Sequence, residues 1–171
     1  MNLSNYFIFI KDKFLSNKEC DFLIKEYKNK TITHKSHTGY KGYFFKKNEF
    51  QFIQRVNDIT LEYIKKYPHL KIQCANFQLT DMRFKYFKSG NFFKNFHAEH
   101  CFKYPYRILN FMIYLSNHEE GTKFYSGEII KSKKGRVVIF PAFWTHLHKG
   151  QKCNKDRFIV GGYYNLIGDA A

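Results

Sequence analysis

Residues 135–141 read Gly-Arg-Val-Val-Ile-Phe-Pro, a short apolar segment that starts at a glycine and ends at a proline. β-Branched and aromatic residues bounded by Gly and Pro are typical of a strand. After Pro68 the chain repeats this pattern in short stretches that are rich in Phe, Tyr, Ile and Val and are separated by Gly, Asn and Lys turns: 70–87, 92–97, 107–115, 122–130, 136–140, 144–148 and 157–164. Strands of this length and spacing predict a sandwich or barrel of antiparallel sheets.

The segment before Pro68 has a different pattern. Ser16-Asn17-Lys18-Glu19 is a capping box, which predicts the start of a helix. Apolar residues at helical spacing over 48–67 predict a second amphipathic helix. A short strand is expected at 6–10, and an irregular connection at 30–45. The order is therefore helices first and strands afterwards.

The composition fits one folded domain. The chain has 171 residues, 44% of them hydrophobic and 20% aromatic, which is enough apolar material for a core. Because no repeat or Pro/Gly-rich linker interrupts it, we expect a single domain, 1–171, with a helical support region at 1–68 and a β core at 69–171. No apolar run approaches the ~20 residues of a membrane-spanning helix, and no secretory signal is recognisable. We therefore expect an intracellular, soluble protein.

The net charge of +15 has two interpretations. Of the 29 basic residues 24 are Lys, and they are dispersed along the chain rather than clustered. Nucleic-acid binders usually gather basic residues on one face, so a solvated surface is favoured over an anionic partner. The cysteines are widely spaced and form no CxxC pair, which indicates free thiols.

Residues of three types that bind metals or anions, His, Glu and Arg, occur in a suggestive order. His97-Ala98-Glu99 places two ligands at i and i+2, on the same face of an extended segment. About fifty residues later come His146 and His148. Two His and one carboxylate form the facial triad that holds non-haem Fe(II) and leaves positions open. Arg157, on the next predicted strand, has the geometry to bind a carboxylate in bidentate fashion.

The motifs of this chain also follow one another in a recognisable series. In order they are Phe14-Leu15-Ser16 to Asp21, Tyr86-Phe87-Lys88-Ser89-Gly90, His97-Ala98-Glu99, Arg107 leading to Ile113-Tyr114-Leu115-Ser116-Asn117, Glu120-Gly121-Thr122-Lys123-Phe124, Gly135 to Pro141, the His pair, and Arg157-Phe158-Ile159-Val160. This series resembles the prolyl 4-hydroxylase-like branch of the 2-oxoglutarate- and Fe(II)-dependent dioxygenases. The resemblance implies a mainly β fold, the double-stranded β-helix (a jelly-roll or cupin-like sandwich), with N-terminal helices on one sheet.

The resemblance also implies a ligand set, with two departures from the family pattern. Glu99 stands where most members have Asp, and the usual double Gly before Thr122 is reduced to Gly121. The implied metal ligands are His97, Glu99 and a distal His. Counting five residues from Pro141, as in the family, selects His146; His148 remains the alternative, because residues at i and i+2 of a strand face the same way.

The implied cosubstrate is 2-oxoglutarate, with O₂. By resemblance Arg157 pairs with its distal carboxylate, Tyr114 donates a hydrogen bond to the same group, and Tyr86 lies nearby. Arg107 is expected to be structural or to line the substrate entrance.

The expected activity is hydroxylation of an unactivated C–H bond with release of succinate and CO₂, on a prolyl or other peptidyl residue. The alternatives are a free small molecule or nucleic acid as substrate, or a non-catalytic β-sandwich binding module. Nucleic acid is not favoured, because Tyr163 stands where the demethylating branch has a second Arg, six residues after Arg157. No membrane partner is expected.

Overall fold

Two antiparallel sheets face each other in the computed structural model, which describes residues 6–33, 39–46, 49–74 and 76–168. The larger sheet has the order β1-β8-β5-β10-β4-β3-β2, and the smaller has the order β7-β6-β9. The strands are β1 Phe9–Lys11, β2 Ile32–Thr33, β3 Lys41–Phe44, β4 Phe77–Phe87, β5 Arg107–Tyr114, β6 Gly121–Phe124, β7 Ile129–Lys131, β8 Val137–Pro141, β9 His148–Gly150 and β10 Arg157–Leu166. The predicted antiparallel sandwich is confirmed.

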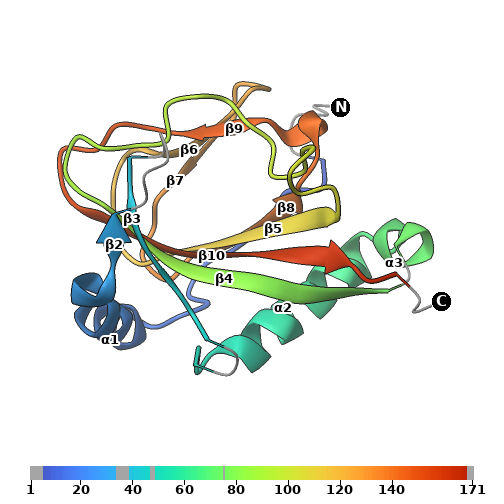
Figure 1. Ribbon diagram of the computed structural model, residues 1–171, viewed down its shortest axis with the longest axis horizontal. Helices are drawn as coiled ribbons and strands as arrows, with labels where there is room; N and C mark the ends of the chain where they lie inside the picture. Colours follow the sequence, from blue (N-terminus) through green and yellow to red (C-terminus); the bar gives the residue numbers. More distant parts are fainter. Residues whose placement is uncertain (1–5, 34–38, 47–48, 75, 169–171) are drawn as a thin grey trace.

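The helices cover the outer face of the larger sheet, on the side away from the smaller one (Figure 1). They are α1 Asn17–Tyr27, α2 Ile53–Lys66 and α3 His69–Gln73, with two 3₁₀ turns, η2 Lys28–Lys30 and η3 Trp144–His146. The capping box at the start of α1 is present, because the Ser16 hydroxyl accepts from Glu19 N while the Glu19 carboxylate accepts from Ser16 N. It satisfies backbone donors that the first helical turn would otherwise leave unpaired.

Strand β5, which lies between β8 and β10, is buried on both faces and separates two clusters of buried residues. Leu109, Phe111 and Ile113 face the helices, whereas Met112 and Tyr114 face the smaller sheet. This alternation is the two-residue period of a strand. The smaller-sheet face of β5 therefore forms one wall of the space between the sheets.

Phe111 is fully buried in the cluster under the helices. We expect Phe111→Ala to lower the free energy of unfolding by about 3–5 kcal/mol, because it removes apolar burial and leaves a cavity. Denaturant titration of the variant beside the wild type measures this difference. Ile10→Ala is the control, because Ile10 is a half-exposed residue of the edge strand β1; a loss of similar size in both variants would contradict the assignment of the core.

The turn before β8 depends on Gly135. Its φ of +79° is in the left-handed region, and a Cβ atom would lie 2.1 Å from the Leu15 carbonyl oxygen. Gly135 O also accepts a hydrogen bond from Leu15 N. Any other side chain at this position would strain the turn and separate it from the segment preceding α1.

Several predicted element boundaries change in the structure. The first part of the expected strand 70–87 is helical, because Pro68 ends α2 and then caps α3. Segment 92–97 is a loop with one bridge, between His97 and His148. The expected irregular connection contains β2 and β3, which extend the larger sheet beside β4. Part of that connection, 34–38, lies outside the described residues.

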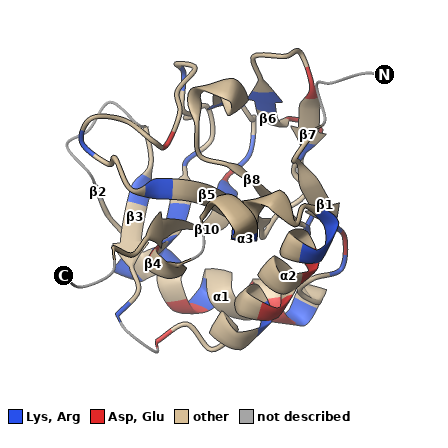
Figure 2. Ribbon diagram, turned by 90° about the vertical axis from the view of Figure 1, so that its right-hand side faces the viewer, with Lys and Arg blue, Asp and Glu red and all other residues tan. Residues whose placement is uncertain are grey.

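Basic residues occur on the helices and on both sheets (Figure 2). Many surface lysines pair with nearby acids, for example Lys133 with Asp12 at 2.7 Å and Lys131 with Glu119 at 2.6 Å. The charge is therefore dispersed, as the sequence predicts. Among the described residues no helix has the length and apolar character needed to cross a membrane.

Candidate metal centre and its cavity

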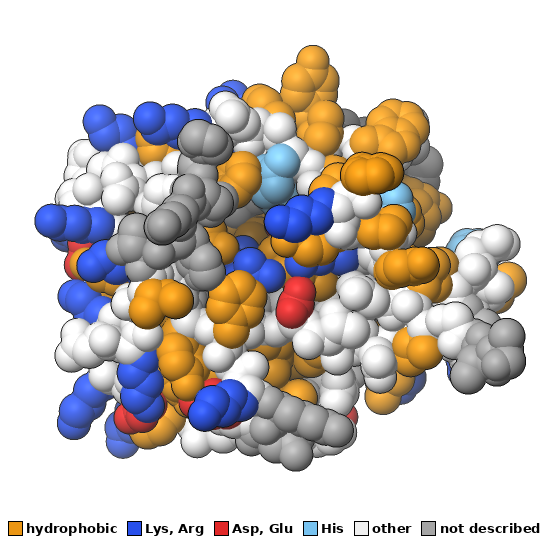
Figure 3. All heavy atoms as spheres, viewed as in Figure 1, with side chains coloured by type: hydrophobic (Ala, Val, Ile, Leu, Met, Phe, Trp, Pro, Cys, Tyr) orange, Lys and Arg blue, Asp and Glu red, His pale blue; other side chains and the backbone are white. Residues whose placement is uncertain are grey.

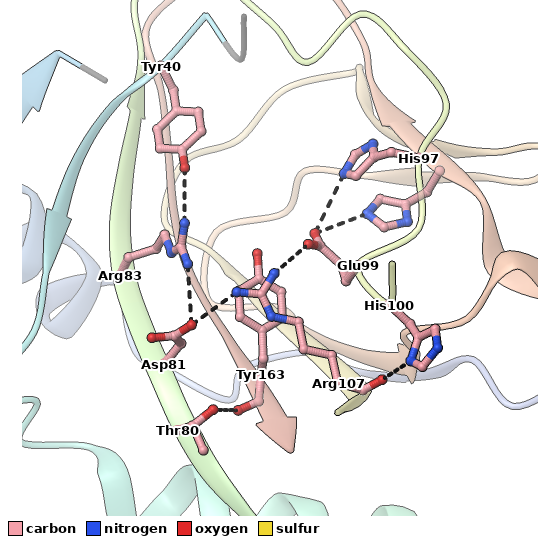
Figure 4. Close-up of polar contacts among 10 residues, drawn as sticks. Tyr40, Thr80, Asp81, Arg83, His97, Glu99, His100, Arg107 and Tyr163 are labelled. Atoms are coloured by element: carbon pink, nitrogen blue, oxygen red, sulfur yellow. Dashed lines mark hydrogen bonds and ion pairs between the residues drawn. The ribbon is translucent and has the colours of Figure 1, made fainter. Parts of the chain in front are cut away.

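Two imidazoles and one carboxylate converge between the sheets. His97 Nε2 lies 3.6 Å from Glu99 Oε1, and His148 Nε2 lies 3.8 Å from the same oxygen. These ligand atoms all lie within 4.8 Å of one another, the spacing at which three groups can share one ion. Figure 4 shows the His97 imidazole directed at the Glu99 carboxylate.

Backbone hydrogen bonds hold the three residues in place. His97 and His148 form a reciprocal bridge, each N–H donating to the other's carbonyl at 3.0 Å. Glu99 N donates to Ala142 O at 3.0 Å, which ties the loop after β4 to the end of β8. The site is therefore fixed by the sheets rather than by side-chain contacts alone.

The structure does not bring His146 to this group, contrary to the preference based on spacing from Pro141. His146 ends the 3₁₀ turn η3, and its ring contacts Tyr6 O at 2.9 Å and the Thr145 hydroxyl at 2.9 Å. Because a turn rather than a strand precedes β9, residues 146 and 148 do not share a face. His148, the alternative, begins β9 and is 5% exposed.

Each histidine of the group is oriented by a carbonyl. His97 Nδ1 lies 3.1 Å from Asn95 O, and His148 Nδ1 lies 3.1 Å from His146 O. When Nδ1–H donates to a carbonyl, Nε2 is left with a free lone pair for a metal. His146 thus contributes its backbone oxygen to the group, and its imidazole contributes nothing.

Electrostatics favour the protonation states that a metal requires. Burial lowers the pKa of His148 to about 4, so its imidazole is neutral near pH 7. Burial alone would raise the pKa of Glu99, but the close contact with His97 and the positive charge of Lys85 hold it well below its usual range. A carboxylate and a neutral imidazole are the forms that coordinate metal ions.

A cavity of about 490 Å³ opens beside the three residues. Figure 3 shows a hollow in this face with basic side chains inside it. Its walls come from β4, β5 and β10 of the larger sheet, from β6 and β9 of the smaller sheet, and from the loop that carries His97. Because residues i and i+2 of β4 share a face, Arg83, Lys85 and Phe87 all line it.

Arg157 lines the cavity and is 2% exposed. Its Nη1 donates only to neutral acceptors, Gly121 O at 3.3 Å, Gln151 O at 3.1 Å and Cys153 Sγ at 3.3 Å. Its Nε has no partner, and no carboxylate of the described residues lies within ion-pairing distance. A buried cation without a counter-charge is costly, so this guanidinium is suited to an anion that the chain itself does not supply.

The two tyrosines predicted near the cosubstrate lie in different places. Tyr114 is fully buried, and its hydroxyl is 2.7 Å from Thr122 Oγ1, which lines the cavity. Tyr86 points to the opposite face of β4, where it stacks on Phe158 and donates to Asp156 at 2.9 Å. Tyr86 therefore lies outside the cavity, because the alternation of β4 places Phe87 there instead.

Sequence reasoning missed Tyr40, which enters from the segment before β3 and lies 5.3 Å, centroid to centroid, from Phe87. It also missed Thr122, Arg83 and Lys85. The alternation along β4 was the signal that pointed to the last two; nothing in the local pattern marks Tyr40, because a long-range strand pairing places it.

Arg107 joins the acidic groups of the site. It pairs with Asp81 at 3.0 Å and with Glu99 Oε2 at 3.5 Å (Figure 4). Its guanidinium is held between the rings of Tyr104 and Tyr163, 3.7 Å from each centroid. Since Oε2 of Glu99 faces Arg107, Oε1 is left to face the histidines. The expectation of a structural or entrance role for Arg107 agrees with this geometry.

A second group of potential ligands, His118, Glu120 and Cys153, lies behind Arg157. Burial raises the pKa of the Cys153 thiol, and the thiol sulfur already accepts from Arg157. A protonated thiol beside a guanidinium is a poor cation ligand. We therefore regard the group containing Glu99 and His148 as the candidate metal centre.

No family model and no curated protein matches the sequence. Solved structures do match the fold. The viral collagen prolyl hydroxylase of Paramecium Bursaria Chlorella virus-1, in complex with 2OG, is 23% identical, with a TM-score of 0.77 over 94% of this chain and 97% of that chain. A Pseudomonas putida prolyl-4-hydroxylase is 13% identical, with a TM-score of 0.75 over 98% and 96%.

A prolyl hydroxylase from Trichoplax adhaerens, in complex with a hypoxia inducible factor peptide fragment, is 12% identical, with a TM-score of 0.70 over 96% and 86%. The chain therefore has the double-stranded β-helix fold of these proteins, over nearly its whole length.

Proposed function

We propose that the protein is an Fe(II)- and 2-oxoglutarate-dependent dioxygenase that hydroxylates an unactivated C–H bond and releases succinate and CO₂. One observation carries the proposal: a His-Glu-His group and a buried, uncompensated Arg157 line the same cavity. A binding module would need neither feature.

The residues that line the cavity are suited to binding both Fe(II) and 2-oxoglutarate. His97, Glu99 and His148 supply the two imidazoles and one carboxylate of a facial triad, which suits non-haem Fe(II). For 2-oxoglutarate, Arg157 Nε is an unpartnered buried donor, and Gly150 leaves room beside it, since a Cβ there would lie 3.0 Å from Arg157 Nη2. Iron with 2-oxoglutarate and O₂ supplies the oxidising chemistry, and the protein supplies orientation and a dry cavity.

Other residues of the chain orient the metal ligands and bind the cosubstrate. Arg107 holds Glu99 Oε2, so that the longer Glu side chain presents its other oxygen to the histidines. Thr122 lines the cavity together with Arg157, and its hydroxyl is 2.7 Å from that of Tyr114, so one hydrogen of the pair is left to donate to a distal carboxylate. For the substrate, a peptidyl residue is favoured; the bound peptide of the Trichoplax structure supports this choice.

The test is Fe(II)-dependent turnover. Purified protein with Fe(II), ascorbate and 2-oxoglutarate in air is expected to form succinate, even slowly and without added substrate, and to stop when iron is chelated. An unbiased mass-spectrometric search for products that gain one oxygen then separates peptide, metabolite and nucleic-acid substrates. Absence of any iron-dependent succinate, in a protein that binds neither iron nor 2-oxoglutarate, would favour the binding module.

The two tyrosines provide a further prediction. Tyr114→Phe is expected to raise the KM for 2-oxoglutarate by about tenfold or more, because hydrogen bonds to charged groups contribute about 1.5–3 kcal/mol. Tyr86→Phe is expected to leave that KM unchanged and to lower stability by about 1 kcal/mol, through loss of its hydrogen bond to Asp156. The reverse result in steady-state kinetics would place Tyr86, not Tyr114, at the cosubstrate.

A further inference from the structure

The mouth of the cavity carries more positive than negative charge. Arg83 and Lys85 from β4 and Arg107 from β5 all line it. Asp81 is shared between Arg107, at 3.0 Å, and Arg83, at 3.6 Å. Glu99 is the one carboxylate among the described residues that line the cavity. The cations outnumber the acids before any ligand is considered.

Lys85 is the cation that this arrangement leaves unpaired. Its side chain enters the cavity beside β10, where it lies against aromatic rings, with Nζ 5.7 Å from the Tyr40 centroid and 5.9 Å from the Tyr163 centroid. No hydrogen-bond acceptor or carboxylate of the described residues pairs with it. Burial lowers the pKa of this ammonium, which reflects the same loss of hydration.

The surroundings leave the Lys85 ammonium accessible from inside the cavity. Lys85 pairs with Ile159 of β10, and the next residue of β10 on that face is Gly161, where a Cβ would lie 3.6 Å from Nζ. Because residue 161 is glycine, it places no side chain against the ammonium. Arg83 stands next to it with a buried, unpartnered Nε, and its Nη1 donates to the Tyr40 hydroxyl at 3.3 Å.

The proposed cosubstrates do not supply the missing negative charge. The charges of Fe(II), Glu99, a doubly charged 2-oxoglutarate and Arg157 balance one another. Lys85, Arg83 and Arg107 then face Asp81 alone. Desolvated cations are tolerated when a counter-ion pairs with them, so the partner is expected to arrive with the substrate.

We propose that the substrate carries a carboxylate near the carbon that is oxidised, and that Lys85, assisted by Arg83, binds it. This inference rests on the proposed function and names its substrate class. A carboxylate, with a single negative charge, is favoured as the anionic group of the substrate because the Lys85 ammonium lacks a partner among the described residues. Arg83 and Arg107 already share Asp81. The carboxylate can belong to an acidic residue of a peptide or to a free amino or carboxylic acid; the net charge of +15 would steer either toward the protein.

The experiment compares matched acids and amides. The 171-residue chain, loaded with Mn(II) and an unreactive 2-oxoglutarate analogue, is dialysed against a defined pool. The pool pairs end-blocked peptides containing Asp or Glu with their Asn or Gln counterparts, and free amino acids with their amides. Retained compounds are quantified by mass spectrometry. The wild type is expected to retain the acids of at least one set about tenfold or more over their amides.

Variants assign the preference to Lys85. Lys85→Met is expected to remove the acid preference, Lys85→Arg to keep most of it, and the control Lys65→Met, on the exposed face of α2, to keep all of it. Circular dichroism checks that each variant is folded, and Arg83→Met gives a second, smaller reduction if Lys85→Met does not fold. The set retained, peptide or free acid, identifies the source of the carboxylate.

Three results would overturn the inference: amides retained as well as acids, no compound of the pool retained, or an acid preference that survives Lys85→Met. Failure of the proposed function is seen separately, because Mn(II)-dependent binding of 2-oxoglutarate is measured first on the same samples. If that binding is absent, the proposed function fails; if it is present without an acid preference, the inference about Lys85 fails alone.

Discussion

His148→Ala is expected to abolish iron-dependent succinate formation, whereas His146→Ala is expected to retain it. The His148 imidazole faces Glu99 and is held by a carbonyl at its other nitrogen, so its removal eliminates one of three ligands. Loss of a residue that merely orients a ligand costs about 10–100-fold in metal affinity or activity, and loss of the ligand itself is expected to cost more. The measurement is succinate formation against Fe(II) concentration, together with direct Mn(II) binding.

His146→Ala provides the matched control. Its imidazole contacts Tyr6 O and the Thr145 hydroxyl, so the variant is expected to lose about 1 kcal/mol of stability. The carbonyl that orients His148 belongs to the backbone of residue 146 and remains in the variant. Loss of Mn(II) binding in His146→Ala, with His148→Ala still binding, would return the third ligand to the position chosen by spacing from Pro141.

The fold could be predicted from the sequence because the patterns that indicate its helices and strands are local. The capping box before α1 and the apolar stretches of β5, β8 and β10 each depend on neighbours within a few residues. Alternation and capping act through the two- and 3.6-residue periods of the backbone, and the structure reproduces these elements. His97 and Glu99, at i and i+2, form a local pattern of the same kind, and the structure places their side chains 3.6 Å apart.

The sequence was least informative where a long-range contact decides which side chains meet. His146 and His148 can be ranked only if one knows that η3 interrupts the strand between Pro141 and β9. The placement of Tyr86 depends on which face of β4 packs on the helices, and this is fixed by pairing with β10. Tyr40 lies in the cavity because β3, which begins at the next residue, pairs with β4. No local pattern contains this information.

The second large effect is expected for Arg157→Met, which should raise the 2-oxoglutarate concentration required for turnover by two to three orders of magnitude. Removing one partner of a buried ion pair costs about 3–5 kcal/mol, and each 1.4 kcal/mol corresponds to about tenfold in affinity. Methionine keeps much of the volume, so packing against Phe87, 4.9 Å from the guanidinium, is disturbed little. Mn(II) binding by His97, Glu99 and His148 is expected to persist, because Arg157 is not a ligand.

The stability of the free protein distinguishes this role of Arg157 from a structural one. Among the described residues Arg157 has no carboxylate partner and an unpartnered Nε, and its hydrogen bonds go to two carbonyls and a thiol. Replacing such a desolvated cation with an apolar side chain is often neutral or stabilising, so the thermal midpoint of Arg157→Met without ligands is expected to be near that of the wild type. The stabilisation that 2-oxoglutarate gives the wild type is expected to be lost, since a ligand stabilises only the state that binds it. Arg136→Met is the control: Arg136 pairs with Asp12 on the surface and lies outside the cavity, so its variant should keep the ligand-induced stabilisation. A wild-type response to 2-oxoglutarate in Arg157→Met would show that the distal carboxylate binds elsewhere.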